Sequence, residues 1–325
     1  MRPFRHFALP LLLVAAPLAF TACTSPTAEQ AGAFALTTRT ALDLLPADAE
    51  VVGLINVAEA RASDALASLT DAGMGLDSMT GEGAARVDDF MARTGFDLEE
   101  DLERVYVAAN PEAGSFVMLM YADVDRARMD AYLQEQTDVD TERTLYRETP
   151  IYVSSDAEGE AFSFALPNDE MMIGGSDATV RAVLDRMADG GAGLRSDATM
   201  MGLLDHAAHP DDAWFAVRSM DEFRSAGESS DAILGAGEFM QRLVVSAGFG
   251  ADGLDVSFFG QTTDAVAPSD VADIVRGAIS GMRMTAKDNP ELTRALDRMR
   301  VSEARDAVRV DAFVSEALLA EMRDR

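Results

Sequence analysis

The chain has 325 residues, of which 48% are hydrophobic and 26% are charged. A chain of this length and apolar content buries a large core and usually divides into domains of roughly 100–200 residues, so two compact units are expected. The 56 acidic residues outnumber the 27 basic ones, which gives a formal charge of −29. Because binding to nucleic acid or to an anionic bilayer surface depends on clustered positive charge, the composition argues against both as direct partners.

The N-terminus has the pattern of a secretory signal. Arg2 and Arg5 precede an apolar run over residues 7–20, which is too short to span a bilayer. Small residues follow and lead directly to Cys23, the only cysteine of the chain. No internal disulfide can therefore form, and the single thiol is available for another use.

The sequence Phe20-Thr21-Ala22-Cys23 resembles the lipobox of bacterial lipoproteins, with Phe20 in place of the usual Leu. This resemblance implies that the signal over residues 1–22 is removed and that the Cys23 sulfur receives a diacylglycerol. Two or three acyl chains hold a protein at a bilayer, whereas one chain alone is marginal. Thr24, rather than Asp, follows the cysteine and resembles the sorting pattern for the outer membrane in Gram-negative bacteria. The alternative is a cysteine that stands by chance in a weak signal peptide.

Residues 23–40 are predicted to be the lipidated cysteine and a flexible tether, because they are small and polar. The folded part is predicted to be α+β, with two tandem split-βαβ (ferredoxin-like) units and mainly antiparallel sheets. These units cover residues 41–204 and 205–325. A short echo supports the repeat, since Pro46-Ala47-Asp48 precedes one strand and Pro210-Asp211-Asp212 precedes another.

In the first unit, apolar residues in runs or in alternation predict strands, and apolar residues three and four positions apart predict helices. The predicted elements are a strand near residue 51, a helix over 85–93, strands over 105–108 and 115–121, a helix over 123–134, strands over 160–166 and 171–174, and a helix that Ser176 caps.

The second unit repeats this order, which is that of the split βαβ motif. Its predicted elements are a strand near residue 214, a helix over 231–242, strands over 243–249 and 254–261, a helix after Pro268, a strand over 309–314 and a short helix that follows it.

Short motifs resemble a loose group of exported bacterial proteins to which no activity is attached. They are Leu45-Pro46-Ala47-Asp48 and Thr94-Gly95-Phe96-Asp97-Leu98, and the similarity covers mainly residues 44–121 and 162–187. The resemblance implies a fold and an exported location, and nothing about activity.

The best candidate for chemistry is the segment between the two predicted units. Imidazole and carboxylate groups can complete a four-ligand site for Zn²⁺ or a similar metal. A Ser–His–Asp set that uses one of the histidines also stays open, because such triads are recognised in space. Against a metal site, no distant ligand is identifiable and a proline favours an extended turn, so a surface turn also explains the segment. The candidate ligands are Asp205, His206, His209, Asp211 and Asp212.

Other motifs are weaker. No phosphate-binding loop or nucleophile elbow is present, and the acidic run over residues 138–142 is typical of solvated surface. We therefore expect a membrane-anchored protein of the bacterial cell envelope that acts as a non-enzymatic binding module, without a cofactor and with an envelope protein as partner. The alternatives are a lipoprotein that binds an apolar small ligand and a metal-dependent enzyme centred on His206 and His209.

Overall fold

The computed structural model describes residues 41–63, 89–98, 100–135, 141–155, 161–221, 239–263 and 266–323. The signal, Cys23, the tether and most of the helix predicted over residues 231–242 lie outside these ranges. Internal contacts divide the chain into two compact units, residues 1–62 with 73–197 and residues 63–72 with 198–325. Each unit combines helices with an antiparallel sheet, so the predicted α+β class is confirmed.

The sheet of the first unit has the strand order β1-β2-β3-β7-β6-β5-β4, and every described pair in it is antiparallel. The helices between and after the strands are α3, α6 and α7. The bounds are β1 Val51–Asn56, α3 Val57–Arg61, β2 Leu102–Asn110, β3 Ser115–Ala122, α6 Arg126–Glu135, β4 Thr141–Tyr146, β5 Thr149–Ser155, β6 Ala161–Asn168, β7 Met171–Ser176 and α7 Asp177–Asp189.

The second unit has the order β11-β12-β10-β9-β8, again with antiparallel neighbours. It starts with α8, which the sequence prediction assigned to the first unit. The bounds are α8 Ala198–Leu204, β8 Ala213–Val217, β9 Met240–Gly250, β10 Gly253–Thr262, α10 Pro268–Thr285, α11 Pro290–Arg298, β11 Arg300–Glu303, β12 Ala307–Ser315 and α12 Glu316–Arg323.

The predicted split βαβ order is not the order observed. In that motif the first two strands are parallel and the third lies between them, whereas β1 pairs directly with β2 and β2 with β3. The register explains the difference, because Asn56 at the end of β1 lies opposite Arg104 near the start of β2. The chain therefore leaves β1 and enters β2 at the same end of the sheet, so the two strands are antiparallel. The pair β8 and β9 repeats this arrangement.

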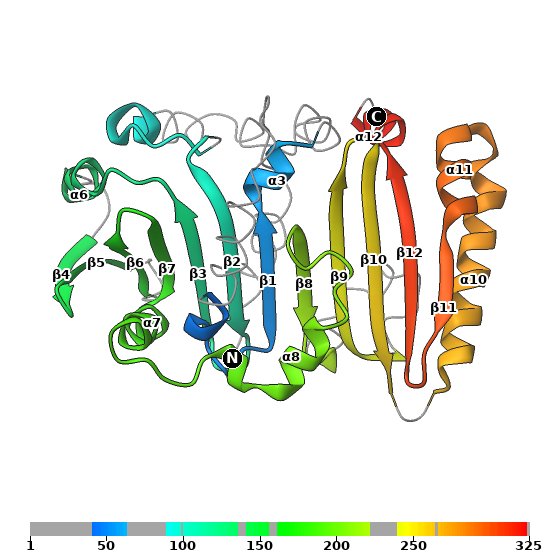
Figure 1. Cartoon of the computed structure of the whole chain (residues 1–325), viewed down its shortest axis with the longest axis horizontal. Coiled ribbons are helices and arrows are strands. Elements are labelled where there is room, and N and C mark those ends of the chain that lie inside the picture. The colour runs from blue at the N-terminus through cyan, green and yellow to red at the C-terminus, as the bar shows by residue number, and fades with distance from the viewer. Residues whose placement is uncertain are drawn as a thin grey trace, which may run out of the picture. The chain divides into compact units, whose positions relative to one another are not determined.

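The two units share one strand plan all the same (Figure 1). Three strands follow one another across the sheet, and a hairpin then returns so that its second strand pairs with the third, as β7 does with β3 and β12 with β10. A helix follows each hairpin, α7 in the first unit and α12 in the second. The first unit adds the hairpin β4–β5, which the sequence analysis did not predict.

Both faces of the first sheet carry apolar residues. On one face, α7 buries Val180, Val183 and Leu184, the stripe that its sequence predicts. On the other face, Met129 of α6 lies in a cluster with Phe96, which precedes β2, and with residues of β2, β6 and β7. Burial of these side chains supplies most of the driving force for the unit.

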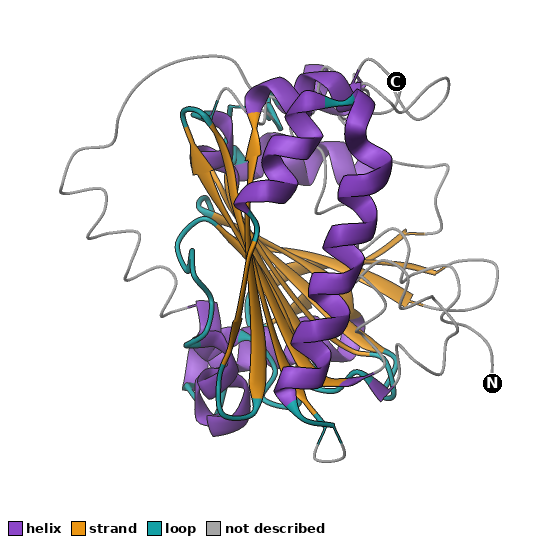
Figure 2. Ribbon diagram, turned by 90° about the vertical axis from the view of Figure 1, so that its right-hand side faces the viewer, coloured by secondary structure: helices purple, strands orange, loops and turns teal. Residues whose placement is uncertain are grey.

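One face of the sheet in the second unit is covered by α10, α11 and α12. The long helix α10, nearest the viewer in Figure 2, buries Val271, Val275 and Ile279 against this face. The side chains of α11 and α12 pack with the same face, at Leu296 and Leu319. No described helix is both long and apolar enough to cross a membrane.

The described chain begins with a segment built into the first unit, residues 41–45, which we call the entry segment. Leu44 and Leu45 are buried. The Leu45 carbonyl accepts a hydrogen bond from the Leu194 amide at 2.9 Å, and the Leu44 carbonyl accepts one from Nε of Arg186 at 2.7 Å. The polypeptide that precedes residue 41 is thus attached to a fixed point of the fold.

Gly193 makes this attachment possible. Its Cα approaches the backbone of Asp43 so closely that a Cβ at position 193 would overlap the Asp43 carbonyl group. Arg195 adds an ion pair with the Asp43 carboxylate at 3.2 Å. The glycine-rich loop after α7 therefore provides the surface that receives the entry segment.

We expect Gly193→Ala to destabilise the first unit by about 1–3 kcal/mol, because the added methyl group must displace backbone atoms. Urea unfolding, followed by circular dichroism, measures this change. The control is Gly202→Ala in α8, where a Cβ meets no atom within 4 Å and helix propensity favours Ala by up to about 1 kcal/mol. Equal stability of Gly193→Ala and wild type would contradict the close approach.

Candidate functional site

The predicted histidine segment lies along one face of the sheet in the second unit. His206 follows the last turn of α8, and its ring stacks on Phe259 of β10 with centroids 3.8 Å apart and planes at 12°. The amide of Ala208 donates to Oγ of Ser246 at 3.0 Å. Farther along, the carbonyl of Pro210 accepts from Nε1 of Trp214 at 3.0 Å. The segment is thus held as a surface strap on β9 and β10.

The strap keeps the two imidazoles apart. His206 covers Phe259, which pairs with Val244 of β9, whereas the His209 ring lies against Gly248, where a Cβ would overlap it. Val244 and Gly248 are four residues apart in one strand, which corresponds to about 13 Å. Two nitrogens that share a zinc ion must each lie about 2 Å from it. The rings are therefore too far apart to share a metal.

The carboxylates do not complete the site either. Among the described residues, which include Asp205, His206, His209, Asp211 and Asp212, no group of three or more His, Cys, Asp or Glu side chains could hold a metal ion. The residues predicted as metal ligands are therefore neighbours in the sequence that the structure does not bring together around a common point.

A nucleophilic triad is not formed in the described part of this face. The Ser257 hydroxyl donates to Oδ1 of Asp311 at 2.8 Å and accepts from Nη1 of Arg309 at 3.1 Å. Nη2 of Arg309 donates to the His206 carbonyl at 2.8 Å. Ser257 is thus bonded to a carboxylate and a guanidinium, and no described serine is hydrogen-bonded to the His206 ring. The network fastens the strap to β12.

A buried polar cluster lies in the first unit, on β2 and β3. Arg104 is only 1% exposed and lies directly opposite Tyr121 across the two strands. The rings of Tyr106 and Tyr121 meet edge to face at 5.8 Å. Burial raises the pKa of Tyr121 far above its usual value, so its hydroxyl stays protonated at any physiological pH. Sequence alone did not single out this cluster, because an arginine in a strand is usually at the surface.

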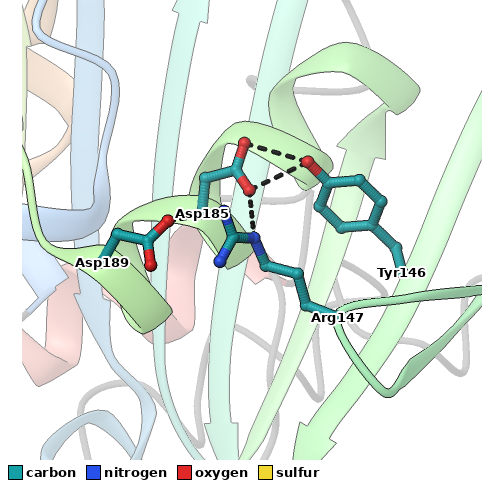
Figure 3. Close-up of polar contacts among 4 residues, drawn as sticks. All are labelled: Tyr146, Arg147, Asp185 and Asp189. Atoms are coloured by element: carbon teal, nitrogen blue, oxygen red, sulfur yellow. Dashed lines mark hydrogen bonds and ion pairs between the residues drawn. The ribbon is translucent and has the colours of Figure 1, made fainter.

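An exposed cluster of charged and polar contacts joins the hairpin β4–β5 to α7, and we call it the hairpin clamp (Figure 3). The Tyr146 hydroxyl lies 2.9 and 3.0 Å from the two carboxylate oxygens of Asp185. Arg147 donates from Nε to Asp185 and from Nη2 to Asp189, each at 2.5 Å. The hairpin supplies the donors and α7 supplies the two carboxylates, one turn apart.

These contacts shift the acidity of the groups involved. The Tyr146 hydroxyl is the main cause of the lowered pKa of Asp185, and the Arg147 guanidinium contributes in the same direction. The hydrogen bonds to Asp189 and then Asp185 raise the pKa of Arg147 above its ordinary value. Asp185 and Arg147 are therefore both charged over the whole neutral range.

The clamp holds a turn that its residues disfavour. Arg147 and Glu148 have φ values of 49° and 65°, and they are the only residues besides glycine with positive φ in the described ranges. A two-residue hairpin turn requires this conformation and usually uses Asn-Gly. A non-glycine residue in the left-handed region costs about 1–3 kcal/mol. Arg147 offsets part of this cost, because in this turn its side chain reaches α7 and pairs with Asp185 and Asp189.

Comparisons with known proteins agree with the fold. No protein-family model matches the chain, and no curated protein matches it. Among solved structures, crystal form III of TP0453 aligns with a TM-score of 0.51 over 87% of this chain and 98% of that chain, at 10% sequence identity. Crystal form I of TP0453 gives a TM-score of 0.49 at the same identity. At this level of identity, the similarity to form III describes the fold alone.

We expect the stability of the first unit to depend on the charge of Asp185. Because the folded state lowers its pKa, the carboxylate stabilises the fold above its unfolded pKa of about 3.9, and this contribution is lost as the pH falls through the lower folded value. Asp185→Asn should therefore lower the urea midpoint at neutral pH. The difference between the midpoints at neutral pH and at about pH 3 should also be smaller in this variant than in the wild type. The control is Glu112→Gln, an exposed turn residue. An unchanged pH dependence in Asp185→Asn would contradict the clamp.

Proposed function

We propose that the chain is a lipid-anchored protein of the bacterial cell envelope whose folded body binds another envelope component without catalysing a reaction. The anchor is the Cys23 sulfur, which carries acyl chains after removal of residues 1–22. The outer membrane is the expected location in a Gram-negative cell, because Thr24 follows the cysteine. The lipobox-like sequence before Cys23 carries this proposal.

The way the chain enters the fold supports an anchor. Eighteen positions separate Cys23 from residue 41, the first described residue, which is buried in the first unit. A flexible segment of this length has a root-mean-square span of roughly 20–25 Å. Such a tether keeps the body near the bilayer. The entry segment that follows the tether stays bound to the first unit through the buried residues Leu44 and Leu45.

The polar clusters support a binding role rather than a catalytic one, because the contacts of each cluster hold one part of the fold on another. His206, Arg309 and Ser257 fasten a strap to a sheet, and the hairpin clamp fixes a hairpin on α7. The acidic charge of −29 favours solubility and disfavours nucleic acid as a ligand. A binding surface made of backbone and apolar groups fits this body better than a reaction centre.

Cys23→Ser tests the anchor. We expect the change to abolish incorporation of labelled palmitate and to move the protein from the membrane fraction to the soluble fraction, because oxygen at this position is not a substrate for lipid transfer. The control is Thr24→Asp, which retains the sulfur and should keep both labelling and membrane association. Unchanged labelling and fractionation of Cys23→Ser would overturn the anchor.

Crosslinking in native membranes tests the binding role. We expect amine- and carboxyl-reactive reagents, applied to native membranes, to join the chain to a recurrent protein of the envelope at a defined position. Cys23→Ser should reduce this product several-fold, because a tether raises the local concentration of a membrane-bound partner. The absence of any specific product, at normal expression and with the anchor intact, would count against the role.

A further inference from the structure

The outer edge of β4 is an open template for another strand. In the strand order of the first unit, β4 is the terminal strand and pairs with β5 alone among the described strands. Native proteins usually block such edges with proline, charged side chains, a bulge or a covering element, and of these β4 carries two charged side chains, Glu142 and Arg143. β4 has the sequence Thr-Glu-Arg-Thr-Leu-Tyr and no irregularity in its register with β5. Its Leu145 is 64% exposed.

The hairpin turn determines which backbone groups point outward. Tyr146 and Thr149 flank the two-residue turn and form its hydrogen-bonded pair, so the next pair, Leu145 and Pro150, is not hydrogen-bonded. Pro150 agrees with this pattern, because it has no N–H to donate to β4. The N–H and C=O groups of Leu145 and Arg143 therefore point away from β5.

The edge is also pre-ordered. The hairpin clamp fixes the turn at Arg147 and Glu148 onto α7 despite the cost of their positive φ values. Nε of Arg143 lies 3.4 Å from both Asp130 of α6 and the Tyr152 hydroxyl. A strand fixed in advance loses little conformational entropy when it pairs with another chain.

A second copy of this chain is a poor occupant of the edge. Antiparallel pairing of two β4 edges centred on Arg143 places Arg143 opposite itself. Like charges directly opposite one another are destabilising. The net charge of −29 adds a general repulsion between copies.

We propose that the β4 edge binds an extended segment of an envelope protein by strand addition, antiparallel to β4. The segment carries an apolar residue opposite Leu145 and an acidic residue two positions later, opposite Arg143. Backbone hydrogen bonds give the affinity in this mode, and alternate side chains give the specificity. Leu145 supplies the apolar contact, and the guanidinium of Arg143, which is 38% exposed beside its ion pair with Asp130, supplies the complementary charge. This inference rests on the proposed binding role and names its surface.

Fluorescence anisotropy tests the proposal with a labelled probe peptide, Thr-Thr-Val-Thr-Glu-Thr, blocked at both ends. The protein is the purified full chain in detergent. We expect saturable binding that weakens at least roughly tenfold when the Val and Glu amides of the peptide are N-methylated, because these amides face β4 and N-methylation removes their hydrogen bonds to it.

Two variants locate the site. Leu145→Pro removes an outward N–H and leaves the ladder with β5 intact, since edge strands tolerate proline when its nitrogen faces solvent. It should abolish binding, whereas the matched variant Leu145→Ala keeps the N–H and should retain most of it. Arg143→Glu should reverse the preference, so that a peptide with Lys in place of Glu binds better. Urea midpoints for all three variants show whether the first unit remains folded.

The possible outcomes decide the proposal. No saturable binding at millimolar peptide, or binding unaffected by N-methylation or by Leu145→Pro, overturns strand addition at β4. A dimer in sedimentation experiments that Leu145→Pro dissociates would identify a second copy as the occupant and would also overturn it. Palmitate incorporation at Cys23 is measured on the same preparation, so failure of the edge is distinguishable from failure of the anchor.

Discussion

The account depends on how the first unit receives the polypeptide that precedes it. The leucines of the entry segment are buried, and the segment is bound to α7 through Leu44 and to the loop after α7 through Leu45 and Asp43. The same helix, α7, carries Asp185 and Asp189, which hold the hairpin β4–β5. One helix therefore joins the start of the folded chain to the exposed edge strand. An anchor upstream of residue 41 would hold that edge at a limited distance from the bilayer.

Much of the architecture could be predicted from the sequence. The strands at Val117 and Leu119 and the α7 stripe with Val183 follow from apolar periodicity, which requires only a local pattern. The strand order could not be predicted in this way, because the neighbour of a strand depends on where the chain returns. The register of Asn56 with Arg104, which makes β1 and β2 antiparallel neighbours, is such a tertiary fact.

The candidate sites also depend on tertiary neighbours that a local sequence pattern does not predict. The histidine segment drew attention by composition, yet His206 stacks on Phe259 and His209 lies against Gly248, so proximity in sequence did not mean a shared ligand. The hairpin β4–β5 escaped prediction because its turn is Arg147-Glu148 rather than Asn-Gly and because acidic residues precede it. Only the contacts with Asp185 and Asp189, about 40 residues later, explain why that turn is stable.

The central claim is that acyl chains on one sulfur hold this acidic body at a membrane, where a fixed edge strand can meet a partner. Mass spectrometry of the N-terminal proteolytic fragment, prepared from membranes of the native host, tests it most directly. The account predicts a fragment that begins at Cys23 and carries a diacylglycerol on the sulfur. A fragment that begins elsewhere, or a Cys23 thiol without lipid, would contradict it.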